Sequence, residues 1–223
     1  MKKQLRFLNI DPRIAENHST RYVVIPVPYE RTVSYGKGTS KGPVAILRAS
    51  MEIEDFDEEL KTSLNLDVRT LKPLSFKNLS QERSMELIRE TVSDEFKNNK
   101  FVLIIGGEHS VSPPVVEAAF RYRGVKSVLQ LDAHTDLRDE FRGHKLSHGC
   151  AMRRCRGLGL KTVHVGIRSC SAGEYDYVRK GQIPVFWADE IITAKDDSWI
   201  ESICKVLIEP VYITVDMDVF DPS

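Results

Sequence analysis

Residues 127–136 read SVLQLDAHTD, a short apolar run followed at once by acidic and imidazole side chains. The run Ser127–Leu131 predicts a strand, and Asp132, His134 and Asp136 follow it at alternate positions. Residues two apart point to the same side of an extended backbone, so we expect these three polar side chains to face one way. Three ionisable groups would be costly to bury unpaired, which favours a ligand-binding role over a simple turn.

Two further apolar runs end in the same manner. Phe101–Ile105 (FVLII) leads into GGEHS, which contains His109, and Val211–Val215 (VYITV) leads into Asp216 and Asp218. Continuous apolar runs of this kind predict strands of a parallel sheet that are buried on both faces. Ligand sites in such sheets lie just outside the carboxyl ends of the strands, so we expect the polar residues of all three segments to form one site.

The rest of the chain alternates short apolar runs with amphipathic stretches, which is typical of a mostly parallel α/β sheet. No internal repeat or Pro/Ser-rich linker interrupts this alternation, so we predict a single domain over residues 1–223. The other expected strands are Tyr22–Val27, Leu66–Leu71, Thr162–Ile167 and Pro184–Phe186. The expected helices are Pro43–Ser50, Leu79–Phe96, Val115–Tyr122, Cys150–Arg156, Glu174–Arg179 and Ser198–Leu207.

The combined site would contain four carboxylates, two imidazoles and no thiolate. This oxygen-rich set favours Mn²⁺, Mg²⁺ or Fe²⁺ over a structural zinc site. Two divalent ions would nearly neutralise four carboxylates, with two aspartates as bridges, and a pair of such ions makes a water nucleophilic at neutral pH. We therefore predict a two-metal hydrolytic centre. The predicted metal ligands are His109, Asp132, His134, Asp136, Asp216 and Asp218.

Overall composition excludes few functions but gives some indication of partners and of cellular location. The 32 Lys and Arg residues balance the 32 Asp and Glu residues, so the charge gives no indication of nucleic acid or an anionic membrane as a partner. The four cysteines show no Cys-x-x-Cys pair and are expected to be reduced thiols. The first residues lack the apolar core of a secretory signal, and no apolar run is long enough to cross a bilayer. We expect a cytoplasmic protein.

Five motifs taken together resemble the ureohydrolase (arginase–agmatinase) family over nearly the whole chain. They are YGKGTSKGPVAIL, GGEHS, LDAHTDLRDE, KLSHGCAMRR and ITVDMDVFDPS. The resemblance implies a three-layer α/β/α sandwich with a mostly parallel central sheet (arginase/deacetylase-like) and two Mn²⁺ ions per subunit. It also implies that Asp132 and Asp216 bridge the two ions and that His148 is the proton shuttle. A homo-oligomer, a trimer or hexamer, is usual in the family. Glu108 stands where most members have Asp, at a position that is not a ligand.

The resemblance further implies hydrolysis of a guanidino substrate to urea and an amine. The spacing between DAHTD and SHG is more similar to agmatinases than to arginases, so agmatine, cleaved to putrescine and urea, is the expected substrate. Arginases carry Asn and Ser where this chain has Leu137–Glu140. Because Arg138 and Arg142 can bind a carboxylate, arginine and guanidinobutyrate stay open as alternatives.

The sequence stops at Ser223, directly after DMDVFDP, whereas the family runs on for several dozen residues. That segment carries a guanidinium-orienting glutamate and a strand that lies inside the sheet. We expect the 223 residues to be part of a longer, active enzyme. The alternative is a metal-binding paralogue of weak activity that assembles with full-length subunits.

A single-zinc deacetylase is the other rival, because it also uses an Asp-x-His-x-Asp motif. It has no counterpart of GGEHS with His109 as a ligand, which favours the two-metal interpretation.

Overall fold

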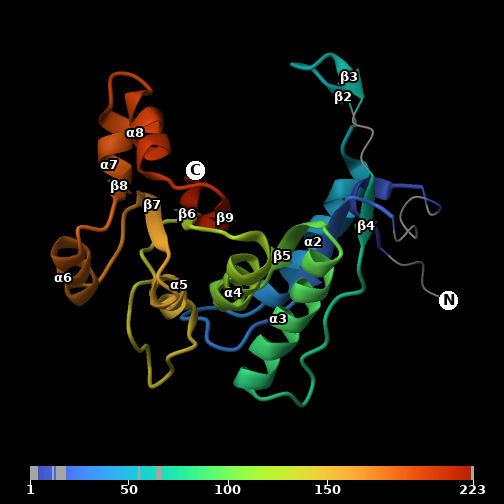
Figure 1. Ribbon diagram of the computed structural model, residues 1–223, viewed down its shortest axis with the longest axis horizontal. Coiled ribbons are helices and arrows are strands. Elements are labelled where there is room, and N and C mark those ends of the chain that lie inside the picture. The colour runs from blue at the N-terminus through green and yellow to red at the C-terminus, as the bar shows by residue number, and fades with distance from the viewer. Residues whose placement is uncertain (1–4, 12, 14–18, 55, 64–66, 222–223) are drawn as a thin grey trace. The chain divides into compact units, whose positions relative to one another are not determined.

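The computed structural model describes residues 5–11, 13, 19–54, 56–63 and 67–221 of the 223-residue chain. The chain divides into two compact units, Met1–Val111 and Ser112–Ser223, and each is described by itself. Each unit contains a sheet of parallel strands with helices in the connections, which confirms the predicted α/β class (Figure 1). That residues 1–223 act as a single domain stays a prediction.

The main sheet of the first unit has the strand order β4-β1-β5, with all pairings parallel. The central strand β1 (Tyr22–Val27) lies between β4 (Val68–Thr70) and β5 (Phe101–Gly106). Residues 23–27 of β1 are buried, as expected for an apolar central strand whose two faces are both covered. Parallel pairing places the ends of β1 and β5 at one edge, where β5 runs into the short helix η4 (His109–Val111).

Two helices, α2 (Gly42–Ala49) and α3 (Gln81–Lys97), contact β5. Helix α3 begins where the Ser80 hydroxyl accepts a 3.1 Å hydrogen bond from the Arg83 amide, which satisfies an otherwise unpaired N–H of the first turn. The smaller elements of this unit are η1 (Phe7–Asn9), η2 (Thr39–Lys41), η3 (Ser50–Glu52), β2 (Phe56–Asp57) and β3 (Thr62–Ser63).

The second unit has a four-stranded parallel sheet of order β8-β7-β6-β9. Its strands are β6 (Ser127–Leu131), β7 (Lys161–Ile167), β8 (Val185–Trp187) and β9 (Val211–Val215). The helices are α4 (Ser112–Arg123), η5 (His148–Cys150), α5 (Ala151–Gly157), α6 (Ala172–Gly181), α7 (Ala188–Thr193), α8 (Ser198–Val206) and η6 (Met217–Val219).

Most of the elements predicted from the apolar pattern are confirmed. The strands Tyr22–Val27, Ser127–Leu131 and Val211–Val215 have the predicted limits, and the predicted helices are present with ends shifted by a few residues. The short helix α7 and the β2–β3 hairpin were not predicted, because segments this short show no readable periodicity. Among the helices of the described residues, none has both the length and the apolar character needed to span a membrane.

The prediction that all three polar-ended strands are buried on both faces is wrong for two of them. Phe101 and Leu103 of β5 are 58% and 44% exposed, and Ile213 and Val215 of β9 are 58% and 49% exposed. Both strands lie at an edge of their sheet as described, so fewer neighbours cover their side chains. An apolar run reports that a strand belongs to a sheet but not its position within that sheet.

The tight packing around Gly107 in the first unit predicts that a larger residue there would destabilise the fold. A Cβ at this position would lie 2.0 Å from the Tyr29 carbonyl oxygen, a backbone atom that cannot move aside cheaply. We expect Gly107→Ala to lower the free energy of unfolding by about 1–3 kcal/mol, the usual cost of overpacking. The control is Gly157→Ala, because a Cβ there meets nothing within 4 Å. Equal denaturant midpoints for the two variants would contradict the close approach.

Candidate metal centre

The site is built at the carboxyl edge of the second unit's sheet, where β6 and β9 end side by side. The two strands pair in register with Leu131 opposite Val215, and the Asp216 amide continues the pairing with a 2.8 Å hydrogen bond to the Leu131 carbonyl. The segments after the strands are also joined, because the Ala133 amide donates to Asp218 Oδ1 at 3.1 Å. Parallel pairing therefore places two acidic segments, more than 80 residues apart in sequence, in contact.

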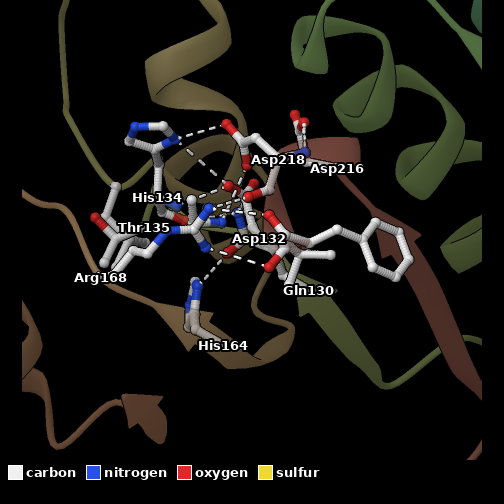
Figure 2. A network of polar contacts seen from close by, with 12 residues as sticks. Gln130, Asp132, His134, Thr135, His164, Arg168, Asp216 and Asp218 are labelled. Atoms are coloured by element: carbon white, nitrogen blue, oxygen red, sulfur yellow. Dashed lines mark hydrogen bonds and ion pairs between the residues drawn. The ribbon is translucent and has the colours of Figure 1, made fainter. Parts of the chain in front are cut away.

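Three of the predicted ligands converge there. Asp132, His134 and Asp218 each offer a ligand atom, and these atoms lie within 4.8 Å of one another. His134 Nδ1 is 3.1 Å from Asp218 Oδ2 and 3.7 Å from Asp132 Oδ1 (Figure 2). The neighbouring carboxylates of Asp132 and Asp218 raise the pKa of His134 to about 10. The two carboxylates thus produce a local negative potential that favours a cation.

The backbone conformation of the segments that carry this cluster differs from the prediction. Residues 132–136 do not continue as an extended strand: the His134 amide folds back to Asp132 Oδ1 at 2.7 Å, and Asp136 has a left-handed φ of +50°. Asp216 and Asp218 do not alternate along a strand either, because Asp216 caps η6 by accepting from the Asp218 amide at 3.2 Å. The carboxylates use local N–H groups to turn the chain, which strand periodicity does not foresee.

Asp136 and Asp216 belong to the same unit. Asp136 is buried and offers a ligand atom within 4.8 Å of one from Asp132. Its carbonyl accepts from the amides of Met152 and Arg153 at 3.0 and 3.2 Å, which fastens the turn to the start of α5. Asp216 lies directly before η6 and beside the cluster in Figure 2.

The other two predicted residues have different surroundings. His109 begins η4 in the first unit, so its place beside the aspartates stays a prediction. His148 begins η5, where its Nδ1 is 3.3 Å from Ser147 Oγ and its ring packs edge-on against Phe141 at 5.5 Å. Its role as a proton shuttle also stays a prediction.

Glu108, which was not predicted to be a ligand, organises the loop around His109. Its Oε2 accepts from the amides of Arg31 and Thr32, both at 2.6 Å, and its Oε1 accepts from the hydroxyls of Thr32 and Ser110 at 2.7 and 2.6 Å. The carboxylate is buried and serves as the structural centre of this turn. Both carboxylate oxygens of Glu108 are therefore engaged by the surrounding loop.

Glu174 was expected only as the first residue of a helix, but it holds the ligand-bearing turn. Its Oε1 accepts from Thr135 Oγ1 at 2.8 Å and from the Leu137 amide at 3.1 Å, and so brackets Asp136. Its Oε2 accepts from the amide and hydroxyl of Ser171 at 2.9 and 2.7 Å, which completes a capping box at the start of α6. One buried carboxylate thus anchors the turn to a helix end.

A second anchor holds η6. The Arg168 guanidinium donates to the Asp218 carbonyl, to the Val219 carbonyl at 3.2 Å and to the Phe220 carbonyl at 3.3 Å (Figure 2). Gly166 has φ +84°, and a Cβ there would lie 2.8 Å from Val219 Cγ2, so η6 packs directly on this glycine. The Asp218 segment is therefore fixed by β7 as well as by β9.

The donor set fits a divalent ion of the hard type, because carboxylate oxygens and an imidazole nitrogen converge at one edge without a thiolate. Ligand sites of parallel α/β sheets lie at this edge, so these acidic and imidazole groups make it a candidate metal site of an α/β enzyme. The arginase-family model matches residues 20–223. The chain therefore belongs to the arginase family, as an agmatinase-like ureohydrolase.

Relatives agree with this assignment. The chain is 41% identical over 209 residues to a Synechocystis protein named N(1)-aminopropylagmatine ureohydrolase, covering 90% of this chain and 68% of that protein. It is 33% identical over 223 residues to an agmatinase of Bacillus cereus, covering 97% of this chain and 73% of the relative.

Solved structures confirm the three-layer α/β/α fold class. The agmatine ureohydrolase of Thermoplasma volcanium matches with a TM-score of 0.83 at 27% identity, covering 99% of this chain and 74% of that one. Proclavaminate amidino hydrolase from Streptomyces clavuligerus matches with a TM-score of 0.82 at 27% identity, covering 99% of this chain and 76% of that one.

The contacts of Glu174 predict a pH-dependent contribution to stability. Burial raises the pKa of this carboxyl, but hydrogen bonds from Ser171, Thr135 and Leu137 outweigh it, and the net pKa is lowered from 4.5. A group with a lowered folded-state pKa stabilises the fold above its unfolded pKa, and this contribution is lost as the pH falls through the folded value. We expect Glu174→Gln to cost about 1–3 kcal/mol near pH 7, because an amide nitrogen would then face N–H and O–H donors.

Chemical unfolding of the wild type and the variant between pH 3 and 7 measures this difference. The gap should be widest above pH 5 and should close below 4.5. Glu201→Gln is the control, because Glu201 is an exposed helix residue and its pairing with Lys205 at 3.4 Å contributes little. A gap that is constant over the whole range would remove the charge of Glu174 from the argument.

Proposed function

We propose that this chain hydrolyses a guanidino compound to urea and an amine at a centre that holds two Mn²⁺ ions. The observation that carries the proposal is the convergence of Asp132, His134 and Asp218 at the sheet edge of an arginase-family chain. The complete ligand set would add His109, Asp136 and Asp216. Cytoplasmic location and assembly into a homo-oligomer, a trimer or hexamer, belong to the same proposal.

The charge of the ligand set supports two ions rather than one. Asp132, Asp136, Asp216 and Asp218 carry about four negative charges, which two divalent ions would nearly neutralise. Two ions, when bound, would supply Lewis acidity and lower the pKa of a water from about 15.7 toward 7. The protein's part is to hold the carboxylates in place before any ion arrives, and the backbone N–H groups of Ala133, His134 and Asp218 do this.

His148 is proposed to supply the proton that the leaving amine requires. An imidazole nitrogen can accept a proton and donate it again within one turnover, as a general acid–base must. Contact with Phe141 and Ser147 fixes the ring on two sides, which limits the directions in which it can deliver that proton.

The surroundings of Arg138 favour an amine-type substrate over an amino acid. Its Nε is 3.3 Å from Glu174 Oε2, and its guanidinium lies over Phe141 at 4.5 Å from the ring centroid. A cation already engaged in this way is poorly placed to bind a substrate carboxylate. Agmatine, which has no carboxylate, is therefore proposed as the substrate. N(1)-aminopropylagmatine is the second candidate, because the Synechocystis relative is named for its hydrolysis.

Urea release from the Mn²⁺-loaded chain tests the proposed function. We expect urea from agmatine or N(1)-aminopropylagmatine and at least ten times less from arginine and guanidinobutyrate. Asp132→Ala should lose both metals and all urea release, because it removes a bridge, whereas the exposed Asp176→Ala should keep both. Metal content is read by elemental analysis of the dialysed protein.

Two metals per chain in Asp132→Ala would contradict the bridging role. Urea from arginine alone would overturn the substrate. One metal per chain in the wild type would favour the deacetylase alternative. Two metals without urea from any substrate would favour the metal-binding paralogue.

A separate substitution tests the proton shuttle. His148→Ala should keep the full metal content and slow turnover by roughly 10²–10⁴, the usual contribution of a general acid–base. His144→Ala is the matched control, because His144 is exposed in the same loop and its contact with Phe141 uses only backbone atoms. Equal turnover numbers for the two variants would exclude His148 from the mechanism.

A further inference from the structure

A chain of buried polar side chains runs behind Asp132, on the side away from His134 and Asp218 in Figure 2. Gln130 and His164 face each other in register on β6 and β7, and Thr162 is two residues from His164, on the same face of β7. All three side chains are fully buried. Polar groups in the middle of two buried strands are costly unless they serve one another, so their hydrogen bonds determine what they do.

The amide of Gln130 has one permitted orientation. Gln130 Nε2 lies 2.6 Å from Asp132 Oδ2 and 3.1 Å from the His134 carbonyl oxygen. A carboxylate and a carbonyl can only accept, so the NH₂ group must face both of them and use both of its hydrogens. Gln130 Oε1 then faces the other way, toward His164.

The orientation of Gln130 sets the tautomer of His164. Gln130 Oε1 is an acceptor and contacts His164 Nδ1, so Nδ1 must carry the proton. In the neutral ring Nε2 is then an acceptor, and it takes the hydroxyl proton of Thr162 at 2.9 Å. The Thr162 oxygen in turn accepts from the Arg156 guanidinium at 3.2 Å.

In each hydrogen bond of this series, the donor therefore lies on the Arg156 side and the acceptor on the Asp132 side. The order runs from the permanently charged Arg156 through Thr162, His164 and Gln130 to the carboxylate. Hydrogen bonds aligned in one direction polarise and strengthen one another in a low-dielectric interior. Asp132 is thus held at both oxygens, at Oδ2 by this chain and at Oδ1 by the His134 amide.

We infer that His164, through Gln130, is a positioning residue for the metal centre that orients the Asp132 carboxylate. This inference rests on the proposed metal centre. Its basis is that Gln130 is held at Nε2 by Asp132 and at Oε1 by His164 Nδ1, so His164 anchors to β7 the amide that donates to Asp132. With Nδ1–H removed, Gln130 Oε1 would lose its buried donor, and the amide that donates to Asp132 would lose its anchor to β7.

The second hydrogen bond of Gln130, to the His134 carbonyl, also bears on the metal centre. By donating to the His134 carbonyl as well as to Asp132, the one amide fixes the backbone of one predicted ligand and the side chain of another. Loss of this anchor should therefore disturb both, and the effect should be on metal affinity rather than on a single catalytic step. Partners that orient metal ligands typically contribute 10–100-fold to affinity.

The test compares three substitutions of buried groups by Mn²⁺ titration calorimetry. His164→Leu removes the donor, His164→Asn keeps a side-chain N–H close to the position of Nδ1, and Gln130→Met preserves length without hydrogen bonds. We expect His164→Leu and Gln130→Met to weaken Mn²⁺ binding by 10–100-fold, and His164→Asn to restore most of the loss. The electron paramagnetic resonance spectrum of the bound Mn²⁺ should change in the first two variants and return in the third.

Unfolding curves identify any variant that fails to fold. If either His164→Leu or Gln130→Met does not fold, the other one is compared with the wild type. Wild-type affinity in a folded His164→Leu or Gln130→Met protein would overturn the inference, as would a failure of His164→Asn to rescue. If the wild type itself binds no Mn²⁺, the proposed metal centre fails instead.

A measurement without metal separates a failure of the inference from a failure of the proposed metal centre. In ¹⁵N-histidine-labelled protein, His164 should show the tautomer with the proton on Nδ1. The opposite tautomer would overturn the inference whatever the metal content.

Discussion

The parallel pairing of β6 with β9, with Leu131 opposite Val215, is the constraint on which the site depends. A shift of this register by one residue would reverse every side chain of β9 and separate the acidic segments that follow. With the observed register, the Asp216 amide reaches the Leu131 carbonyl and the Ala133 amide reaches Asp218. Two carboxylate segments from distant parts of the chain are thereby joined through backbone groups, whose positions the sheet determines.

Like charges brought together in this way repel, so the fold has to supply compensation before any cation is bound. Backbone N–H groups provide part of it, at Asp132, Asp216 and Asp218. The protonated His134 provides another part, because the neighbouring carboxylates keep its pKa high. The same arrangement of carboxylates and imidazole would favour a divalent cation between them. Electrostatic strain at the sheet edge and affinity for metal are therefore two consequences of one geometry.

The sequence was sufficient to predict the α/β class, the limits of three strands and the residues that converge at the edge. Those predictions rest on periodicity and on the rule that sites follow the carboxyl ends of parallel strands. The sequence did not reveal the left-handed turn at Asp136 or the 3₁₀ turn after Asp216, because both arise from side chains that bond to nearby amides. It also gave no indication that Glu174 would reach the turn at Thr135, 39 residues away, since such a contact depends on tertiary packing. Gln130 and His164 left a readable signal, because each is a polar residue within an apolar strand.

The contacts of Glu174 connect the metal-binding turn to the segment that the sequence associates with substrate choice. One of its oxygens fixes Thr135 and Leu137 around Asp136, and the other pairs with Arg138. Arg138 then lies over Phe141, and Phe141 packs against His148. A substitution anywhere along this series would change the position of a predicted ligand and of the predicted proton shuttle together. The contacts of Glu174 therefore link the turn around Asp136 to the surroundings of His148 through Arg138 and Phe141.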